Sequence, residues 1–292
     1  MAEIHHFDHG WITPTVSYVL SVLGSLLGLI CAVRLRSAPN SGWRIWWLSL
    51  AAVAIGGTGI WSMHFVAMMG FSVVGSPIRY DIGLTAASAL IAVIAVGLGL
   101  IVVFAGTRAR FARIIVGGVI AGLGVAAMHY TGMAAMRLDG TVDYSIGRVT
   151  ASIAIAVVAA SVALWLTVTV QRPAALVVSA FIMGVAVNGM HFTGMSAMSV
   201  QQHSMAGPLE GAKASTLLIP ISLAVIFAVM GLVYALMSAP TEEDRAGAAY
   251  LAARLESGGG PVVPEQRRPD QQPGRPGSAL GGAWTYRDRA GR

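Results

Sequence analysis

Seven apolar stretches decide which solvent this chain folds in. They run over residues 13–33, 45–70, 81–105, 113–136, 149–170, 174–198 and 215–237. Each is long enough to cross a bilayer, which takes about 20 residues. Hydrophobic residues make up 55% of the chain and charged residues only 11%, which excludes a soluble domain. The sequence therefore predicts an all-α integral membrane protein, a multi-pass protein of the cell membrane with about seven transmembrane helices in the lipid bilayer.

The arginines indicate how the helices are oriented. The connections after the first, third and fifth stretches carry basic residues and no acidic ones: Arg34, Arg36, Arg44, Arg108, Arg110, Arg113 and Arg172. By the positive-inside rule these loops are cytoplasmic, so the N-terminus lies outside and the C-terminus in the cytoplasm. The net charge is +6, but the basic residues lie in loops and in the tail and do not line up along one face of an element. No nucleic-acid partner is therefore expected.

Three parts follow from this pattern. Residues 1–12 form an extracytoplasmic segment without the basic residues of a cleaved signal peptide, residues 13–238 a seven-helix membrane domain, and residues 239–292 a cytoplasmic tail. In the tail, Thr241 and the acidic residues after it can cap a short helix to about Leu255. Residues 258–292 are rich in Gly, Pro, Gln and Arg, so we expect disorder there and no catalytic output domain.

The second, fourth and sixth stretches carry the same motif. The three copies are Met63-His64-Phe65-Val66-Ala67-Met68, Met128-His129-Tyr130-Thr131-Gly132-Met133 and Met190-His191-Phe192-Thr193-Gly194-Met195. A glycine stands seven residues before each histidine, at Gly57, Gly122 and Gly184. Agreement in three places indicates an internal repeat of two helices. The first six helices are therefore predicted to form three parallel two-helix repeats, related by an axis along the membrane normal.

This repeat places all three motifs on the outer side of the membrane. With a rise of 1.5 Å per residue, each histidine is expected roughly 10 Å below the outer end of its helix. The methionine four residues later lies on nearly the same helix face, one turn further out. The methionine directly before each histidine points about 100° away, toward a neighbouring helix.

We place the three motif histidines within the membrane, and their side chains can ionise near neutral pH. Ionisable groups inside a membrane are candidates for a functional role. Imidazole nitrogen combined with thioether sulfur suits copper, especially Cu(I). The predicted metal ligands are His64, His129, His191, Met63, Met68, Met128, Met133, Met190 and Met195. Haem stays open, since two histidines, or histidine with methionine, are valid axial ligands.

Other interpretations of the motif remain. The histidines can act only as hydrogen-bonding groups between helices, with methionines as packing residues. Parallel repeats also occur in transporters, so a copper or small-solute carrier is a second alternative. Asn188 either orients the His191 imidazole or satisfies backbone groups. The segment from His5 to His9 can capture a metal outside the membrane, and no nucleophile–base constellation predicts an enzyme.

At these motifs the chain resembles the MHYT domain, a bacterial membrane sensor module named for its Met-His-Tyr-Thr signature. Residues 128–131 reproduce that signature, whereas Phe65, Val66 and Phe192 depart from it. The resemblance covers roughly residues 9–238. It implies a signalling domain that senses oxygen, carbon monoxide or nitric oxide through copper held by Met and His. Many members carry cyclic dinucleotide enzymes or a histidine kinase, so the resemblance also implies a cytoplasmic signalling partner for this chain.

Overall fold

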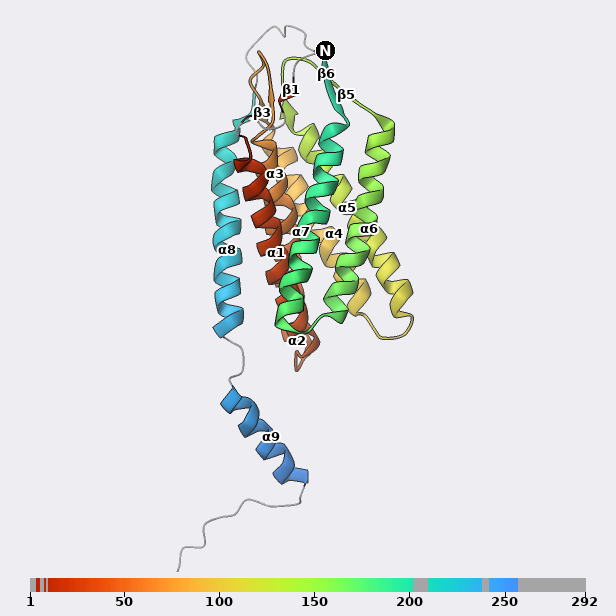
Figure 1. Ribbon diagram of the computed structural model, residues 1–292, viewed down its shortest axis with the longest axis vertical. Helices are drawn as coiled ribbons and strands as arrows, with labels where there is room; N and C mark the ends of the chain where they lie inside the picture. Colours follow the sequence, from red (N-terminus) through yellow and green to blue (C-terminus); the bar gives the residue numbers. More distant parts are fainter. Residues whose placement is uncertain (1–3, 6–7, 9, 202–209, 238–241, 257–292) are drawn as a thin grey trace, which may run out of the picture. The chain divides into compact units, whose positions relative to one another are not determined.

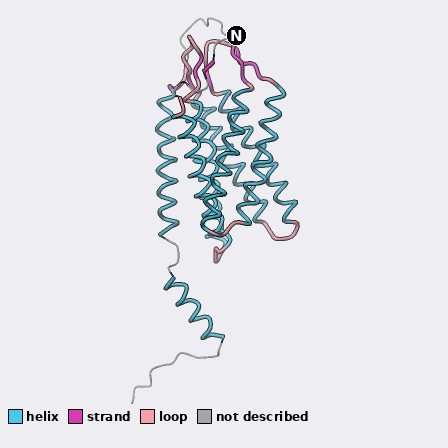
Figure 2. The backbone as a smooth tube through the Cα atoms, viewed as in Figure 1, coloured by secondary structure: helices cyan, strands magenta, loops and turns pink. Residues whose placement is uncertain are grey.

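The computed structural model describes residues 4–5, 8, 10–201, 210–237 and 242–256, which fall into two units, Met1–Ala239 and Pro240–Arg292. Among the described residues, seven helices are long and apolar enough to cross a membrane, which confirms the predicted fold class. The helices of the first unit run side by side, as Figures 1 and 2 show. Their bounds are α1 (Ile12–Arg36), α2 (Ser41–Ala52), η1 (Val53–Ser62), α3 (Met63–Met68), α4 (Ile82–Phe104), α5 (Arg110–Ala134), α6 (Ile146–Thr169), α7 (Pro173–Ser196), η2 (Ala214–Leu217) and α8 (Leu218–Met237).

Six crossings close into a ring that follows the order of the chain. The second crossing, made of α2, η1 and α3, packs between α1 and α4; α4 then contacts α5, α5 contacts α6, α6 contacts α7, and α7 returns to α1. The seventh crossing, α8, packs from outside on α1 and η1. The second crossing is consequently 83% buried and the seventh only 17%. The three repeats thus surround one axis, and the even-numbered crossings can bring their histidines together.

Polar side chains help to close the ring between α1 and α7. The Asn188 side-chain oxygen accepts a hydrogen bond from the Ser17 hydroxyl at 2.7 Å, and its amide donates to the Ser21 hydroxyl at 3.2 Å. The same amide donates to the carbonyl of Gly184, one turn back on α7, at 2.8 Å. These bonds use the donors and the acceptor of the Asn188 side chain on α1 and on its own helix. Asn188 therefore joins helices and satisfies backbone, the second of its two predicted roles.

The first repeat differs from the others because η1 is a π-helix, which was not expected from the sequence. A Cβ built on Gly56 would lie 2.8 Å from the Ala92 carbonyl oxygen, much as one on Gly122 would lie 2.8 Å from that of Ala156. One on Gly57 would meet nothing closer than 3.8 Å. The structural equivalent of Gly122 is therefore Gly56, one residue before the Gly57 that stands at the same distance from the motif histidine in the sequence. A π-helix holds more residues per turn than an α-helix, so the repeat gains one residue there.

The π-helix is bound by two neighbours. The Ser21 hydroxyl of α1 donates to the Gly59 carbonyl at 3.0 Å, and the Thr58 hydroxyl donates to the Ala224 carbonyl of α8 at 3.1 Å. Widened helical turns leave carbonyl groups poorly paired, and such groups in a membrane need protein donors. Through Thr58 the seventh helix is attached to the repeat that carries His64.

Short strands form in the connections at one end of the helices (Figure 2). They are β1 (Ile4–His5), β2 (Ser72–Val73), β3 (Arg79–Tyr80), β4 (Met136–Arg137), β5 (Thr141–Tyr144), β6 (Met198–Gln201) and β7 (Ala212–Lys213). All pairings are antiparallel: β1 with β2, β3 with both β4 and β7, and β5 with β6. The strands link loops of different repeats into a layer on the face assigned as outer.

This layer shortens the even-numbered helices at their outer ends. The second, fourth and sixth crossings end at Met68, Ala134 and Ser196, two residues before the ends predicted from hydropathy. The histidines thus lie four or five residues from the helix end, about 6–8 Å rather than the expected 10 Å.

The second unit contains α9 (Glu242–Glu256), where a short helix was expected. The predicted Thr241 cap and the predicted disorder of residues 258–292 lie outside the described residues. So do His6 and His9 of the proposed N-terminal capture segment, of which His5 lies in β1.

Candidate metal centre

The three motif histidines meet inside the ring. His64 Nδ1 lies 3.0 Å from His191 Nδ1 and 3.2 Å from His129 Nδ1. Each of the three side chains is at most 1% exposed. Among the described residues, these form the one group of three or more His, Cys, Asp or Glu side chains close enough to share a metal ion, with ligand atoms all within 4.8 Å of one another.

The imidazole rings are arranged with nearly threefold symmetry. Their centroids are 4.9, 5.0 and 5.2 Å apart, and the ring planes cross at 76°, 82° and 88°. Three nitrogens that share one ion at about 2.0 Å would stand roughly 3.3–3.5 Å apart. The observed Nδ1 separations are close to that range, so a small shift of the rings would accommodate an ion. Rings this close leave no room for a porphyrin between them, so the geometry favours an ion over haem.

The glycine three residues after a histidine makes room for the imidazole of the preceding repeat. A Cβ on Gly132 would lie 2.4 Å from His64 Nε2, and a Cβ on Gly194 would lie 2.3 Å from His129 Nε2. Real Cβ atoms do not approach other atoms this closely. Gly132 and Gly194 therefore leave room for these two rings, and small residues also let membrane helices approach closely.

Two nitrogens of the triad have no hydrogen-bond partner among the described residues. Within the described part of the chain, Nε2 of His64 and Nε2 of His129 are buried and have no hydrogen-bond partner. A neutral imidazole has one N–H and one nitrogen lone pair. His64 Nδ1 has two Nδ1 neighbours at contact distance, and with a single N–H or a single lone pair it cannot form a separate hydrogen bond with each of them. An ion that accepted the Nδ1 lone pairs would remove their mutual repulsion, and the donor set fits a metal on these grounds.

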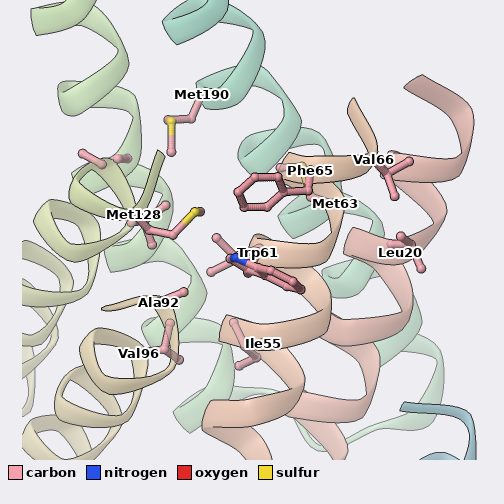
Figure 3. Close-up of a cluster of buried hydrophobic side chains, with 14 of the residues drawn as sticks. Leu20, Ile55, Trp61, Met63, Phe65, Val66, Ala92, Val96, Met128 and Met190 are labelled. Atoms are coloured by element: carbon pink, nitrogen blue, oxygen red, sulfur yellow. The ribbon is translucent and has the colours of Figure 1, made fainter. Parts of the chain in front are cut away.

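The six predicted methionine ligands are all buried in one cluster. They are Met63, Met68, Met128, Met133, Met190 and Met195, none more than 3% exposed. Figure 3 shows Met128 and Met190 extending from their helices into the interior space that Phe65 and Trp61 also face. All six side chains thus belong to the buried core, and their role as metal ligands stays a prediction.

Aromatic side chains connect the triad to the outer strand layer. The Phe65 ring stacks edge-on against His64 at 4.8 Å and against Tyr80 at 5.9 Å. In the next repeat, Tyr130 contacts His129 at 4.9 Å and Tyr144 at 6.0 Å. Burial raises the pKa of Tyr80 and of Tyr144, so both phenols stay neutral at physiological pH. The histidines are thus covered by aromatic rings rather than by charged groups.

Neither of these two tyrosines was predicted as part of the site. Tyr80 and Tyr144 pair across the strands with Met136 and Met198, the methionines seven residues after His129 and His191. Their spacing of 64 residues is close to the 65 that separates His64 from His129, and this signal was available in the sequence. Thr193, the threonine of the third motif, donates a hydrogen bond within its own helix, to the Gly189 carbonyl at 2.7 Å.

A family profile confirms the resemblance carried by these motifs. The profile named MHYT, described as a bacterial signalling protein N terminal repeat, matches residues 57–117 and 122–180. The first match contains the His64 motif and the second the His129 motif. The chain belongs to the MHYT family. Its third MHYT motif, at His191, contributes the third ring of the triad.

Curated relatives with MHYT-like regions are signalling proteins. MucR of Pseudomonas aeruginosa, a bifunctional diguanylate cyclase/cyclic di-GMP phosphodiesterase, is 35% identical over 228 residues, which is 75% of this chain and 33% of MucR. The cyclic di-GMP phosphodiesterase NbdA of the same organism is 38% identical over 167 residues, 53% of this chain and 20% of NbdA. The signaling protein YkoW of Bacillus subtilis is 29% identical over 217 residues, 70% of this chain and 26% of YkoW.

The MHYT chain spans a third or less of the length of these relatives. No solved structure matches it. The similarity therefore concerns the membrane region and places this chain among the MHYT membrane modules of signalling proteins.

Proposed function

We propose that this MHYT module binds one copper ion at His64, His129 and His191 and uses the site to sense a redox change or a diatomic gas. The observation that carries the proposal is the meeting of three buried Nδ1 atoms, two contacts of 3.0 and 3.2 Å, on three separate crossings. Copper, when bound, supplies a change of oxidation state and a coordination position for a small ligand.

The chain's own residues set the conditions for such a site. The histidines offer neutral nitrogen donors, and the buried methionines add thioether sulfur, which favours Cu(I) over zinc. Gly132 and Gly194 leave the space that two of the imidazoles occupy. The aromatic rings of Phe65 and Tyr130 keep water from the outer side. The ligands come from three crossings, so a change in their spacing moves helices relative to one another.

We further propose that the module has no catalytic activity of its own and passes its state to a cytoplasmic partner or domain. The relatives named as cyclic di-GMP enzymes support this direction of signalling. The path available in this fold runs from His64 through η1 to Thr58 and α8, the last crossing before the cytoplasmic side.

Copper binding can be tested on the purified full chain in nanodiscs, loaded with copper under reducing conditions and freed of excess metal. We expect one copper per chain by elemental analysis. A folded His64→Ala/His129→Ala/His191→Ala variant should hold none. Wild-type protein that binds no copper after loading would overturn the proposal and leave the packing interpretation, which predicts a loss of stability alone.

The methionines require a separate test. Leucine conserves the volume of methionine and removes its sulfur. We expect Met128→Leu/Met133→Leu to weaken Cu(I) binding at least about tenfold while leaving Zn(II) binding unchanged. Met230→Leu is the matched control, because Met230 is 63% exposed on α8, away from the triad. Equal Cu(I) affinities in all three proteins would show that the methionines only pack.

A further inference from the structure

A second space lies inside the helix ring, on the cytoplasmic side of the histidines. It is a cavity of about 50 Å³, several times the ~10–15 Å³ that a single water requires on this measure. All six crossings of the ring line it. The mechanism proposed for the histidines makes no use of this cavity.

The cavity lies on the same axis as the triad. Ile60, Val125 and Val187, which line it, each stand four residues before a motif histidine and so one turn further in on the same helix face. A second layer consists of Ile55, Ala121 and Met183. Ala121 and Met183 stand eight residues before their histidines and Ile55 nine, as the extra residue of the π-helix requires.

Met190 connects the two sites. It lines the cavity and directly precedes His191. Figure 3 shows Met190 together with Ile55 and Val96 of the cavity lining around the same interior. An occupant of the cavity would therefore lie within one helical turn of the imidazoles.

The lining is suited to an apolar occupant and unsuited to water. Apart from Ser25 and Thr167 it consists of aliphatic side chains and methionines. The Thr167 hydroxyl already donates to the Leu164 carbonyl at 2.7 Å. A buried water needs two to four polar partners, whereas cavities with aliphatic walls stay dry and accept xenon or small hydrocarbons.

Small residues keep the cavity open on one side. Helix α6 contributes Ala156, Ala159, Ala160 and Ala163. The lining residues from α1, η1, α4 and α5 are buried, but Ala159, Ala160 and Ala163 of α6 and Ala186 and Val187 of α7 are only half-buried. The cavity therefore approaches the surface between α6 and α7, at a depth where the surroundings are hydrocarbon. Apolar solutes concentrate there, because transfer out of water is favourable for them.

We infer that this cavity is a binding site for a small apolar molecule of diatomic size, entered from the bilayer between α6 and α7. The site exists whether or not a metal is bound. Its use to deliver a ligand to the histidines rests on the proposed sensor function.

Xenon is a suitable probe, because its binding to metal-free protein is independent of copper. Chelator-treated full chain in nanodiscs is titrated with xenon and followed by xenon NMR. We expect saturable binding to the wild type. Ala160→Leu, which fills the cavity, should weaken binding at least tenfold. The matched control Ala154→Leu adds the same atoms to an exposed position of α6 and should stay within twofold of wild type.

Ala160→Val serves as a smaller filling variant should the leucine disturb the fold, and it is expected to weaken binding by an intermediate factor. Absence of saturable xenon binding in the wild type overturns the inference, as does equal binding in the folded Ala160 and Ala154 variants. Wild-type protein that takes up no copper on loading but still binds xenon would sink the metal proposal and leave the cavity site intact.

Discussion

His129 Nε2 points at the backbone of Gly194 on the next repeat, where a Cβ would stand only 2.3 Å from it. His64 has the same relationship with Gly132, at 2.4 Å. The residue three positions after His129 or His191 thus decides whether the imidazole of the preceding repeat, His64 or His129, has room. The second and third motifs therefore each leave room for the imidazole of the preceding repeat, whereas the first motif carries Ala67 at the equivalent position.

Gly194→Ala should therefore displace the His129 ring. We expect a loss of about 1–3 kcal/mol in stability from overpacking and at least about a tenfold loss of copper affinity, measured by chelator competition. Gly189→Ala is the control on the same helix, because a Cβ there meets nothing within 4 Å. Unchanged copper affinity in Gly194→Ala would contradict the assigned ring position.

Asn188→Leu should weaken the closure of the ring between α1 and α7 without removing the metal. It deletes three hydrogen bonds, to Ser17, Ser21 and Gly184. We expect a loss of about 1–2 kcal/mol in unfolding experiments in detergent. Copper stoichiometry should stay at the wild-type value, and its loss from a folded variant would instead assign Asn188 to positioning an imidazole. Thr193→Val removes only a bond within α7 and is the control.

Thr58→Val should loosen α8 from the π-helix, since the Thr58 hydroxyl donates to the Ala224 carbonyl. A loss of about 0.5–1 kcal/mol is expected, the usual size for one hydrogen bond between membrane helices. The control Thr150→Val removes a bond that stays within α6. Under the proposed signalling path, crosslinking between α8 and α1 should respond to copper loading in the wild type and respond less in Thr58→Val. An equal response in both proteins would argue against this path.

Asp81 should make the outer layer sensitive to acid. Its carboxylate accepts a hydrogen bond from the Leu84 N–H at 3.0 Å and pairs with Arg137 at 2.8 Å, and both lower its pKa. A carboxyl whose pKa is lowered by folding stabilises the fold above its unfolded pKa and loses that contribution as pH falls through the folded value. The loss is therefore expected below about pH 4. Asp81→Asn keeps a capping oxygen but cannot titrate, so its melting temperature should change less between pH 5 and pH 3 than that of the wild type; equal changes would contradict the prediction.

The sequence alone determined the crossings and the motif. Hydropathy is a property of each stretch by itself, because a helix that crosses lipid must satisfy its own backbone and present apolar side chains. The repeat was visible because duplicated helices keep their side chains at fixed offsets, so His64, His129 and His191 stood out together with their methionines and small residues. The family resemblance depended on the same letters.

The tertiary structure decided which atoms of those residues meet. Closure of six helices into one ring turned three equivalent positions into a triangle of Nδ1 atoms and directed Nε2 of His64 and His129 at Gly132 and Gly194. The π-helix places Gly56 rather than Gly57 against Ala92, and no local pattern reveals that contact. Tyr80 and Tyr144 gained their place over the triad through strand pairing between repeats. Contacts between segments about 60 residues or more apart depend on how the helices pack. The pattern of residues along the chain indicates only which helix faces are available for packing.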